Sequence, residues 1–139
     1  MGYRSEVVYM LAGEPEAMKR ELAAFRMCFP MGKEQQELFR EIQHIYPKSD
    51  DDPDQLLVLK YAASDVKWYP DFEDVKMMNA LYSHFEGVQD GADEGTPEAA
   101  FNGAWSRVGE EENDAEHSDF GDEGYELCPV SRTIDCLYD

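Results

Sequence analysis

The hydrophobic pattern of the N-terminal half predicts a strand, two helices and a second strand. Tyr3–Leu11 is apolar on both of its alternating faces, which is typical of a strand in the centre of a sheet. A helix is expected at 13–30, where apolar residues recur every three or four positions up to a proline, and another at 33–46. Gln55–Ala62 is short, apolar and bounded by turn residues, so it predicts the second strand.

The C-terminal half predicts one more helix and two more strands. Asp71–Glu86 carries an apolar stripe and is followed by Gly87, a suitable C-terminal cap. Ala99–Val108 alternates as a strand, with an aromatic face. Leu127–Leu137 predicts the last strand, with Val130 and Ile134 as its core residues.

The order β-α-α-β-α-β-β predicts an α+β fold. We expect a two-layer α/β sandwich of about four mostly antiparallel strands, with three helices on one face. The length favours a single domain over 1–139, because domains of roughly 100–150 residues are the commonest. The residues predicted to be buried are Phe25, Leu57, Leu59, Leu81 and Phe85.

Charge changes this picture by excluding two classes of partner. The net charge is −19, with 16 acids and 2 bases in residues 86–139 against 15 acids and 10 bases in residues 1–85. Direct binding to nucleic acid or to an anionic membrane depends on basic surfaces, so neither is expected. No apolar run reaches the roughly 18 residues of a transmembrane helix. We therefore expect a protein that acts in the cytoplasm.

The acidic charge is concentrated between the last two predicted strands, which makes a long hairpin loop at about 109–124. Long loops between paired strands are usually functional or disordered. One interpretation is a solvated surface that keeps the protein in solution. The other is a surface that binds a basic partner, with carboxylates spaced like DNA phosphates. The stretch Glu110–Glu126, which includes this loop, has nine acids and no base: Glu110, Glu111, Glu112, Asp114, Glu116, Asp119, Asp122, Glu123 and Glu126.

An aromatic cluster before the third predicted helix has two interpretations as well. Trp68, Tyr69 and Phe72 lie within five residues. They could pack beneath the helix as core, or supply the large rigid side chains that dominate binding interfaces. Both interpretations stay open for Trp68 and Tyr69.

Two short motifs carry a resemblance. The start Gly2-Tyr3-Arg4-Ser5-Glu6-Val7 and the segment Val66-Lys67-Trp68-Tyr69-Pro70 resemble a group of small proteins encoded by tailed bacteriophages. Members typically open with a Gly-Tyr-Arg-Ser-acid-Val strand and carry a similar acidic C-terminal hairpin. The resemblance implies an accessory phage protein in the bacterial cytoplasm, which would bind or inhibit a host component. It assigns no functional residues.

Metal and cofactor sites are not indicated. A twelve-residue calcium loop needs acids or amides at positions 1, 3 and 5 and a glutamate at 12. A loop starting at Asp90 has Ala92 at position 3 and Phe101 at 12, and one starting at Glu116 has Phe120 at position 5. A weak, nonspecific cation site among the acids remains an alternative. We expect no cofactor, because no phosphate-binding glycine motif is present.

The potential zinc ligands and nucleophiles lack the usual spacings. Cys28 lies beside an apolar helical stripe and is expected in the core. An odd number of cysteines favours free thiols in a reducing compartment, with a Cys128–Cys136 disulfide as the alternative. The histidines are expected at helix ends or on the surface. The residues concerned are His44, His84, His117, Cys28, Cys128 and Cys136.

The leading hypothesis is a phage-type binding or inhibitory protein, and not an enzyme. It would engage a basic surface on a host nuclease, defence protein or transcription component. DNA mimicry is one way in which it could do so. The alternatives are a small enzyme or nucleotide-binding protein with a site assembled from scattered residues, and a structural protein whose sign would be a symmetric oligomer. The oligomeric state is open. The candidate partner-binding residues are Glu110, Glu111, Glu112, Asp114, Glu116, Asp119, Asp122, Glu123 and Tyr69.

Overall fold

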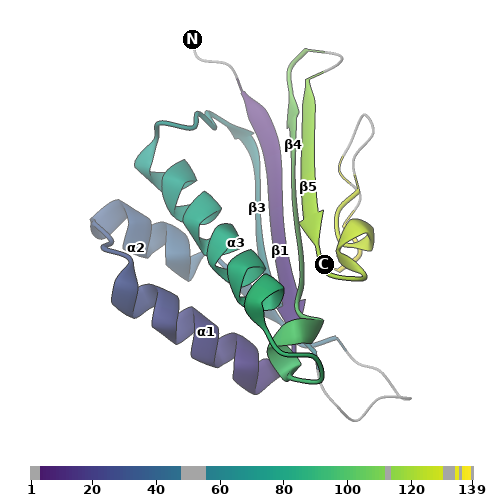
Figure 1. Ribbon diagram of the computed structural model, residues 1–139. Coiled ribbons are helices and arrows are strands. Elements are labelled where there is room, and N and C mark those ends of the chain that lie inside the picture. Colours follow the sequence, from purple (N-terminus) through teal and green to yellow (C-terminus); the bar gives the residue numbers. More distant parts are fainter. Residues whose placement is uncertain (1–3, 48–55, 112–113, 130–133, 135, 139) are drawn as a thin grey trace.

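A computed structural model describes residues 4–47, 56–111, 114–129, 134 and 136–138. The elements are β1 (Ser5–Gly13), α1 (Pro15–Cys28), α2 (Lys33–Arg40), β2 (Gln43–Ile45), β3 (Leu57–Val66), α3 (Glu73–Gly91), the short 3-10 helix η1 (Pro97–Ala100), β4 (Asn102–Gly109), β5 (Ala115–Phe120) and the 3-10 helix η2 (Gly124–Glu126). The strands form one antiparallel sheet in the order β2-β3-β1-β4-β5. The helices α1, α2 and α3 lie on one face (Figure 1). The predicted α+β class is confirmed.

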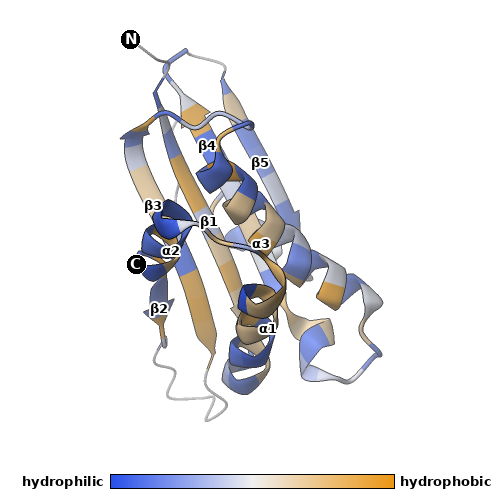
Figure 2. Cartoon of the chain, turned by 90° about the vertical axis from the view of Figure 1, so that its left-hand side faces the viewer, coloured by the Kyte–Doolittle hydropathy of each residue, from blue (hydrophilic) through white to orange (hydrophobic). Residues whose placement is uncertain are grey.

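The central strand β1 is buried on both faces, as its sequence predicts. Val7, Tyr9 and Leu11 belong to the cluster beneath the helices. The residues between them pack on the other face against the C-terminal segment, which includes Leu127 and Cys128. Figure 1 shows this segment opposite the helices, and Figure 2 shows the hydrophobic residues along β1 and β3. Five of the residues predicted to be buried have at most 4% exposure: Phe25, Leu57, Leu59, Leu81 and Phe85.

The predicted second helix is too long. It ends at Arg40, and Gln43–Ile45 instead forms β2, which pairs with β3. Hydrogen bonds to the neighbouring strand β3 satisfy the backbone groups of this segment. It is therefore a strand, although its apolar residues recur with the spacing of a helix. The third helix is longer than predicted, because Gly87 lies within α3 and does not cap it. A fifth strand is therefore present, and the predicted element order lacks β2.

The predicted acidic loop at 109–124 is wrong, because much of it is the edge strand β5. Each residue of β5 faces a residue of β4, and Arg107 lies opposite Glu116. The connecting turn is closed by Gly109 N–H, which donates to Asp114 O at 2.7 Å. Charged side chains are common on edge strands, where they prevent association with other sheets. The acids are therefore displayed on a regular hairpin.

The predicted last strand, Leu127–Leu137, is also not found among its described residues. Gly124–Glu126 forms η2 ahead of it, and the segment then has a single bridge residue at Ile134. Residues 130–133 and 135 lie outside the described part of the chain. Among its described residues, Leu127, Cys128 and Ile134 pack in the hydrophobic cluster on the second face of the sheet.

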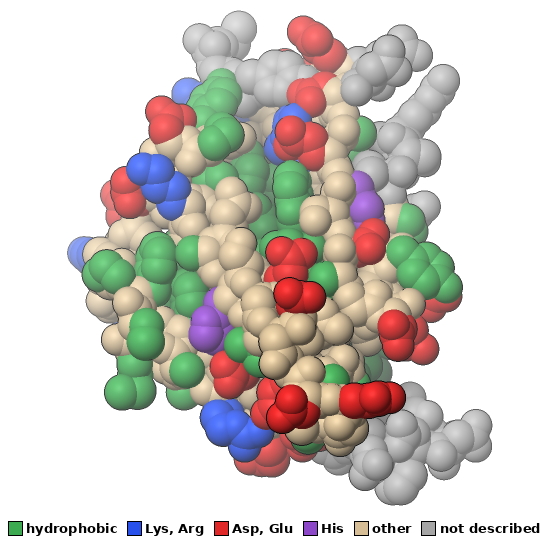
Figure 3. All heavy atoms as spheres, viewed as in Figure 1, with side chains coloured by type: hydrophobic (Ala, Val, Ile, Leu, Met, Phe, Trp, Pro, Cys, Tyr) green, Lys and Arg blue, Asp and Glu red, His purple; other side chains and the backbone are tan. Residues whose placement is uncertain are grey.

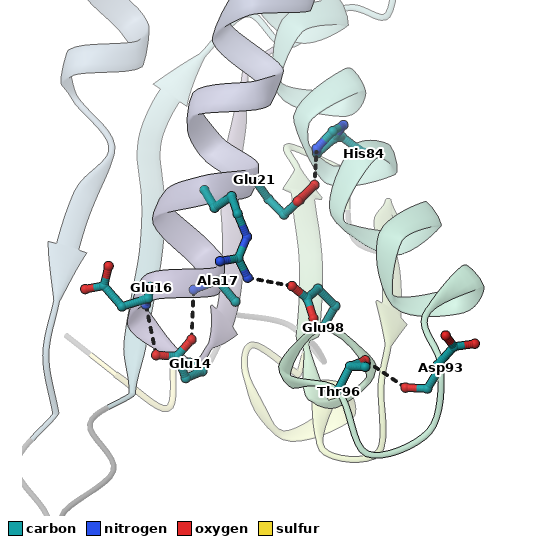
Figure 4. Close-up of polar contacts among 9 residues, drawn as sticks. Glu14, Glu16, Ala17, Glu21, His84, Asp93, Thr96 and Glu98 are labelled. Atoms are coloured by element: carbon teal, nitrogen blue, oxygen red, sulfur yellow. Dashed lines mark hydrogen bonds and ion pairs between the residues drawn. The ribbon is translucent and has the colours of Figure 1, made fainter.

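Ion pairs connect α1 to its neighbours on the helical layer (Figure 4). Glu14 caps α1 by accepting hydrogen bonds from the backbone N–H groups of the first turn, as expected for a carboxylate at a helix N-terminus. Arg20 donates to Glu98 of η1 at 2.7 Å, and His84 of α3 lies 3.3 Å from Glu21. These contacts join α1 to η1 and to α3.

Candidate functional site: an aromatic hollow beside an acidic face

A row of aromatic side chains crosses the helical face of the sheet. Tyr61, Tyr9 and Trp105 occupy directly facing positions on β3, β1 and β4. Trp68, from the connection between β3 and α3, packs against this row with its ring centroid 5.8 Å from Tyr61 and 6.0 Å from Tyr9. The rings of Tyr9 and Trp105 are stacked at 5.8 Å. Cross-strand aromatic pairs of this kind stabilise a sheet and hold the rings rigidly.

A hollow of about 380 Å³ lies between this row and α3. Its size is in the range of small-molecule and side-chain binding sites. Tyr9, Trp68 and Trp105 form the aromatic part of the wall, and Asp114 and Glu116 form an acidic part. Figure 3 shows this side of the molecule, where apolar side chains (green) are visible between α3 and the β4–β5 hairpin, with acidic side chains (red) above them.

Arg107 holds the acidic part of the wall in place. Its guanidinium donates to Asp114 at 3.1 and 2.5 Å, to Glu116 at 2.9 Å and to Ser5 Oγ at 3.0 Å. The hydrogen bonds that Arg107 donates to Asp114 raise the pKa of Arg107 above its ordinary value, and the hydrogen bond to Glu116 adds to the effect. The Arg107 side chain is 13% exposed, whereas that of Glu116 is 55% exposed. Arg107 is therefore an anchor for the two carboxylates.

The aromatic cluster that the sequence singles out contributes to both core and hollow. Trp68 is partly buried and packs against the core cluster, as the first interpretation predicts, and it also lines the hollow. Its role in binding stays a prediction. Tyr69 is partly buried and lines the same hollow. The ring of Phe72 packs edge-on against that of Tyr69, with 5.1 Å between the ring centroids. Beneath them, the Tyr9 hydroxyl donates to Asn79 Oδ1 at 2.6 Å, and burial raises the pKa of Tyr9 to about 12.

The predicted acidic residues do not all share one role. Asp114 and Glu116 bind Arg107, and Glu110 accepts a hydrogen bond of 2.7 Å from the backbone N–H of Arg4. Asp119 lies 2.8 Å from His117 Nε2. The remaining predicted residues are Glu111, Asp122 and Glu123, which are exposed, and Glu112, which lies outside the described residues.

Alternation along β5 separates its two carboxylates. Glu116 and Asp119 are an odd number of residues apart, so they project from opposite faces of the sheet. Only the end of the strand brings further acids together, at the turn that contains Asp122 and Glu123. Within β5, therefore, the carboxylates do not form a row along one face.

Gly121 sets the direction of that turn. Its φ is +83°, a value that glycine adopts readily, and a Cβ at this position would lie 2.4 Å from the carbonyl oxygen of Phe101. The Glu123 backbone N–H donates to Asn102 Oδ1 at 3.0 Å. The turn is thus tied to β4, and it presents its acidic side chains at a defined position.

The structure also brings together a serine, a histidine and an aspartate that sequence reasoning did not connect. Ser106 Oγ lies 2.7 Å from His117 Nδ1, and His117 Nε2 lies 2.8 Å from Asp119. Ser106 is fully buried and donates its proton to the carbonyl oxygen of Cys128 at 2.6 Å. A nucleophile needs access to substrate and a base that takes its proton. This chain of contacts instead joins β5 to the C-terminal segment.

The cysteines and the other histidines have structural surroundings. Cys28 is exposed, which contradicts its predicted place in the core, because it lies in the last position of α1 and off the buried stripe. Cys128 is buried, and burial raises the pKa of its thiol to about 11. Cys28 and Cys128 are free thiols. His44 lies on β2, and His84 lies within α3 and not at its end.

The described residues include no group of three or more His, Cys, Asp and Glu side chains arranged to hold a metal ion. Among the helices of these residues, none has the length and apolar character needed to cross a membrane.

Sequence reasoning missed Tyr9, Asn79, Trp105 and Arg107 as residues of the site. One signal for Arg107 was present, since it is the only Lys or Arg in residues 77–131. A lone base inside a strongly acidic stretch indicates an internal ion pair. Trp105 and Arg107 are two residues apart on the same strand, so their side chains point to the same face of the sheet. This spacing would have placed both residues beside the hollow.

Comparison of the chain with protein-family models, with curated proteins and with solved structures finds no match. The site is therefore interpreted from its own geometry.

A pair of double variants tests which acids are structural. We expect Asp114→Asn with Glu116→Gln to lower the free energy of unfolding by about 1–2 kcal/mol, because Arg107 loses its charged partners at a partly buried position. Asp122→Asn with Glu123→Gln removes the same charge from the neighbouring turn, where both side chains are exposed. It should leave stability unchanged or raise it, because repulsion among acids is relieved. Urea unfolding measures both, and equal losses would contradict the assignment.

Proposed function

We propose that this protein is a binding protein that uses its acidic face to engage a basic surface on another protein in the bacterial cytoplasm. By acidic face we mean the β4–β5 hairpin, the turn before η2, η2 itself and the C-terminal end of α3. Residues 77–131, which contain these elements, hold 14 acids and one base. That base, Arg107, is already bound by two of the acids. The uncompensated charge of this face is the observation that carries the proposal.

The partner class follows from charge complementarity. An extended negative surface attracts proteins that carry a matching positive one and accelerates their encounter. Proteins that handle nucleic acids carry such surfaces, because they bind phosphates. A host nuclease, defence protein or transcription component is therefore the proposed partner, which the binding would inhibit.

Rigidity supports binding over simple solvation. A flexible acidic loop loses conformational entropy when it binds, whereas a preformed surface loses little. Here the acids lie on a hydrogen-bonded hairpin and on a turn tied to β4. Mimicry of DNA by a regular row of carboxylates stays a prediction, because the alternation of β5 does not by itself supply such a row.

The second candidate function is an enzyme, and it rests on the contacts among Ser106, His117 and Asp119. The burial of Ser106 and the hydrogen bond that its hydroxyl donates to a carbonyl argue against nucleophilic chemistry there. The described wall of the hollow contains neither a histidine nor a cysteine. We therefore favour binding.

The test compares two variants that have lost equal charge at different places. The first carries Asp122→Asn, Glu123→Gln and Glu126→Gln on the acidic face. The matched control carries Glu34→Gln, Glu37→Gln and Glu41→Gln on and beside α2, where the side chains are also exposed. Each immobilised protein would capture partners from bacterial lysate at low and at high salt, with circular dichroism confirming the fold.

We expect the wild type and the α2 variant to retain the same captured protein at low salt. The acidic-face variant should retain at least about tenfold less, and high salt should release the partner from all three proteins, since exposed charges are screened beyond about 8 Å at physiological ionic strength. Equal loss in both variants would mean that only net charge matters. Capture that salt does not affect would refute an electrostatic interface.

A further inference from the structure

Arg107 is the only cationic side chain in the described wall of the hollow, and most of its N–H donors are already used within the protein. A guanidinium has five N–H donors. Four of those of Arg107 are used, by Glu116, Asp114 and Ser5. The group formed by Arg107 and its two acids contains two carboxylates and one guanidinium, so its formal net charge is −1. An anionic ligand would therefore meet an occupied arginine and a negative wall.

The remaining acceptors favour a ligand that is rich in hydrogen-bond donors. Glu116 contacts Arg107 through one carboxylate oxygen, and its side chain is 55% exposed at the edge of the hollow. Asn79 Oδ1 already accepts from Tyr9, at 2.6 Å. The charged groups in the described wall are thus two carboxylates and one arginine whose donors are largely used.

The aromatic walls favour a cation for a separate reason. The face of an indole or phenol ring carries negative electrostatic potential and attracts a positive group placed over it. Trp68 and Trp105 are both only partly buried, while Tyr9 between them is 3% exposed. The hollow therefore presents ring surface next to carboxylates, which is the combination that recognises cationic groups.

We propose that the hollow accepts the guanidinium group of an arginine on the basic partner. This inference rests on the proposed function and adds the residue type that the partner inserts. Arginine suits the site better than lysine, because a guanidinium is planar, stacks on aromatic rings and sheds water more readily. Its forked donors also match a carboxylate such as that of Glu116. An arginine that is buried in a pocket against aromatic rings resembles the hot-spot residues of protein interfaces.

The chain contains its own reporter for this binding. It has two tryptophans, Trp68 and Trp105, and both line the hollow. Tryptophan emission therefore responds to an occupant. The probes are capped pentapeptides with four lysines and a central residue that is arginine, lysine or citrulline. The arginine and lysine peptides carry equal charge, and citrulline keeps the shape of arginine without its charge.

We expect the arginine peptide to change tryptophan emission saturably and to bind roughly tenfold more tightly than the citrulline peptide. The lysine peptide should bind with intermediate affinity. In Trp105→Leu the difference between the arginine and lysine peptides should disappear, because the stacking surface is gone. Since Trp105→Leu also removes a stack on Tyr9, circular dichroism must confirm that it folds.

A second variant keeps every ring in place. Glu116→Gln should weaken the arginine peptide several-fold, whereas Asp122→Asn, which removes one charge outside the hollow, should have a smaller effect. Equal affinity for the arginine and lysine peptides in the wild type would overturn the inference, as would equal effects of these two variants.

The two proposals fail in distinguishable ways. If all three peptides bind in a salt-dependent manner with equal affinity, the acidic face still binds basic partners and only the arginine site is refuted. If no peptide binds while the acidic-face variant still loses its partner from lysate, the arginine site is again refuted and the proposed function stands. If no peptide binds and the acidic-face variant also keeps its partner from lysate, both the arginine site and the proposed function are refuted.

Discussion

Replacing Phe85 by alanine is expected to lower the free energy of unfolding by about 3–5 kcal/mol. Phe85 is fully buried on α3, in the cluster between the helices and the sheet. The centroid of its ring lies 5.5 Å from that of Phe101. Its removal leaves a cavity that the neighbouring elements cannot fill, so contacts are lost in addition to the burial of the ring. Urea unfolding followed by circular dichroism measures the change.

Phe72→Ala is the matched control for this experiment. It deletes the same atoms at the start of the same helix, but Phe72 is 42% exposed and contacts Tyr69 edge-on. We expect a loss of less than about 1 kcal/mol, because little apolar surface is removed from water there. Similar losses in the two variants would contradict the position of α3 against the sheet.

Raising the pH from 10 to 12 is expected to destabilise the protein. Burial raises the pKa of Tyr9, Tyr61 and Tyr82 to about 12 in the folded state. In the unfolded chain tyrosine titrates near 10. Between these values the unfolded chain loses protons that the folded chain keeps, so the stabilisation is complete below pH 10 and is lost as pH rises through the folded pKa. For Tyr9 alone, a shift of this size corresponds to about 2–3 kcal/mol.

The measurement is urea unfolding at pH values from 9 to 12, with tyrosinate absorbance recorded in parallel. Tyr9→Phe should flatten the decline, because the folded and unfolded states then differ by one titrating group fewer. The variant also loses the hydrogen bond to Asn79, so its stability at pH 9 should already be about 1 kcal/mol lower. Ionisation of every tyrosine near pH 10 without unfolding would contradict the burial of the aromatic row.

The two stability predictions concern the same part of the molecule as the proposed site. Phe85 lies on α3, and α3 provides one wall of the hollow through Val75 and Asn79. Tyr9 forms part of the opposite wall. The binding surface therefore rests directly on the core, and its geometry should persist as long as the fold does.

Several elements were predictable because their information is local. The apolar runs of β1 and β3 and the apolar stripe of α1 lie in contiguous residues, so period and burial could be inferred together. The α+β class and the buried core residues, among them Leu59 and Phe85, followed from the same pattern and are confirmed.

The elements that were wrong depend on neighbours distant in the chain. Ala115–Phe120 has little β-forming character, and it becomes β5 because β4 supplies Arg107 opposite Glu116 and Ser106 opposite His117. Gln43–Ile45 becomes β2 because β3 has an edge to pair with. Periodicity within a segment does not contain the partner that stabilises it.

The sequence by itself determined the fold class, most of the core and the strongly acidic character of the C-terminal half, because these are properties of composition and local order. Only the tertiary structure decided which acids are bound internally, and it alone assembled the hollow. Tyr9, Trp68 and Trp105 come from distant parts of the chain and meet only when two strands and a connection pack together. Arg107 then neutralises part of the charge beside them, so the site depends on pairings that no single segment encodes.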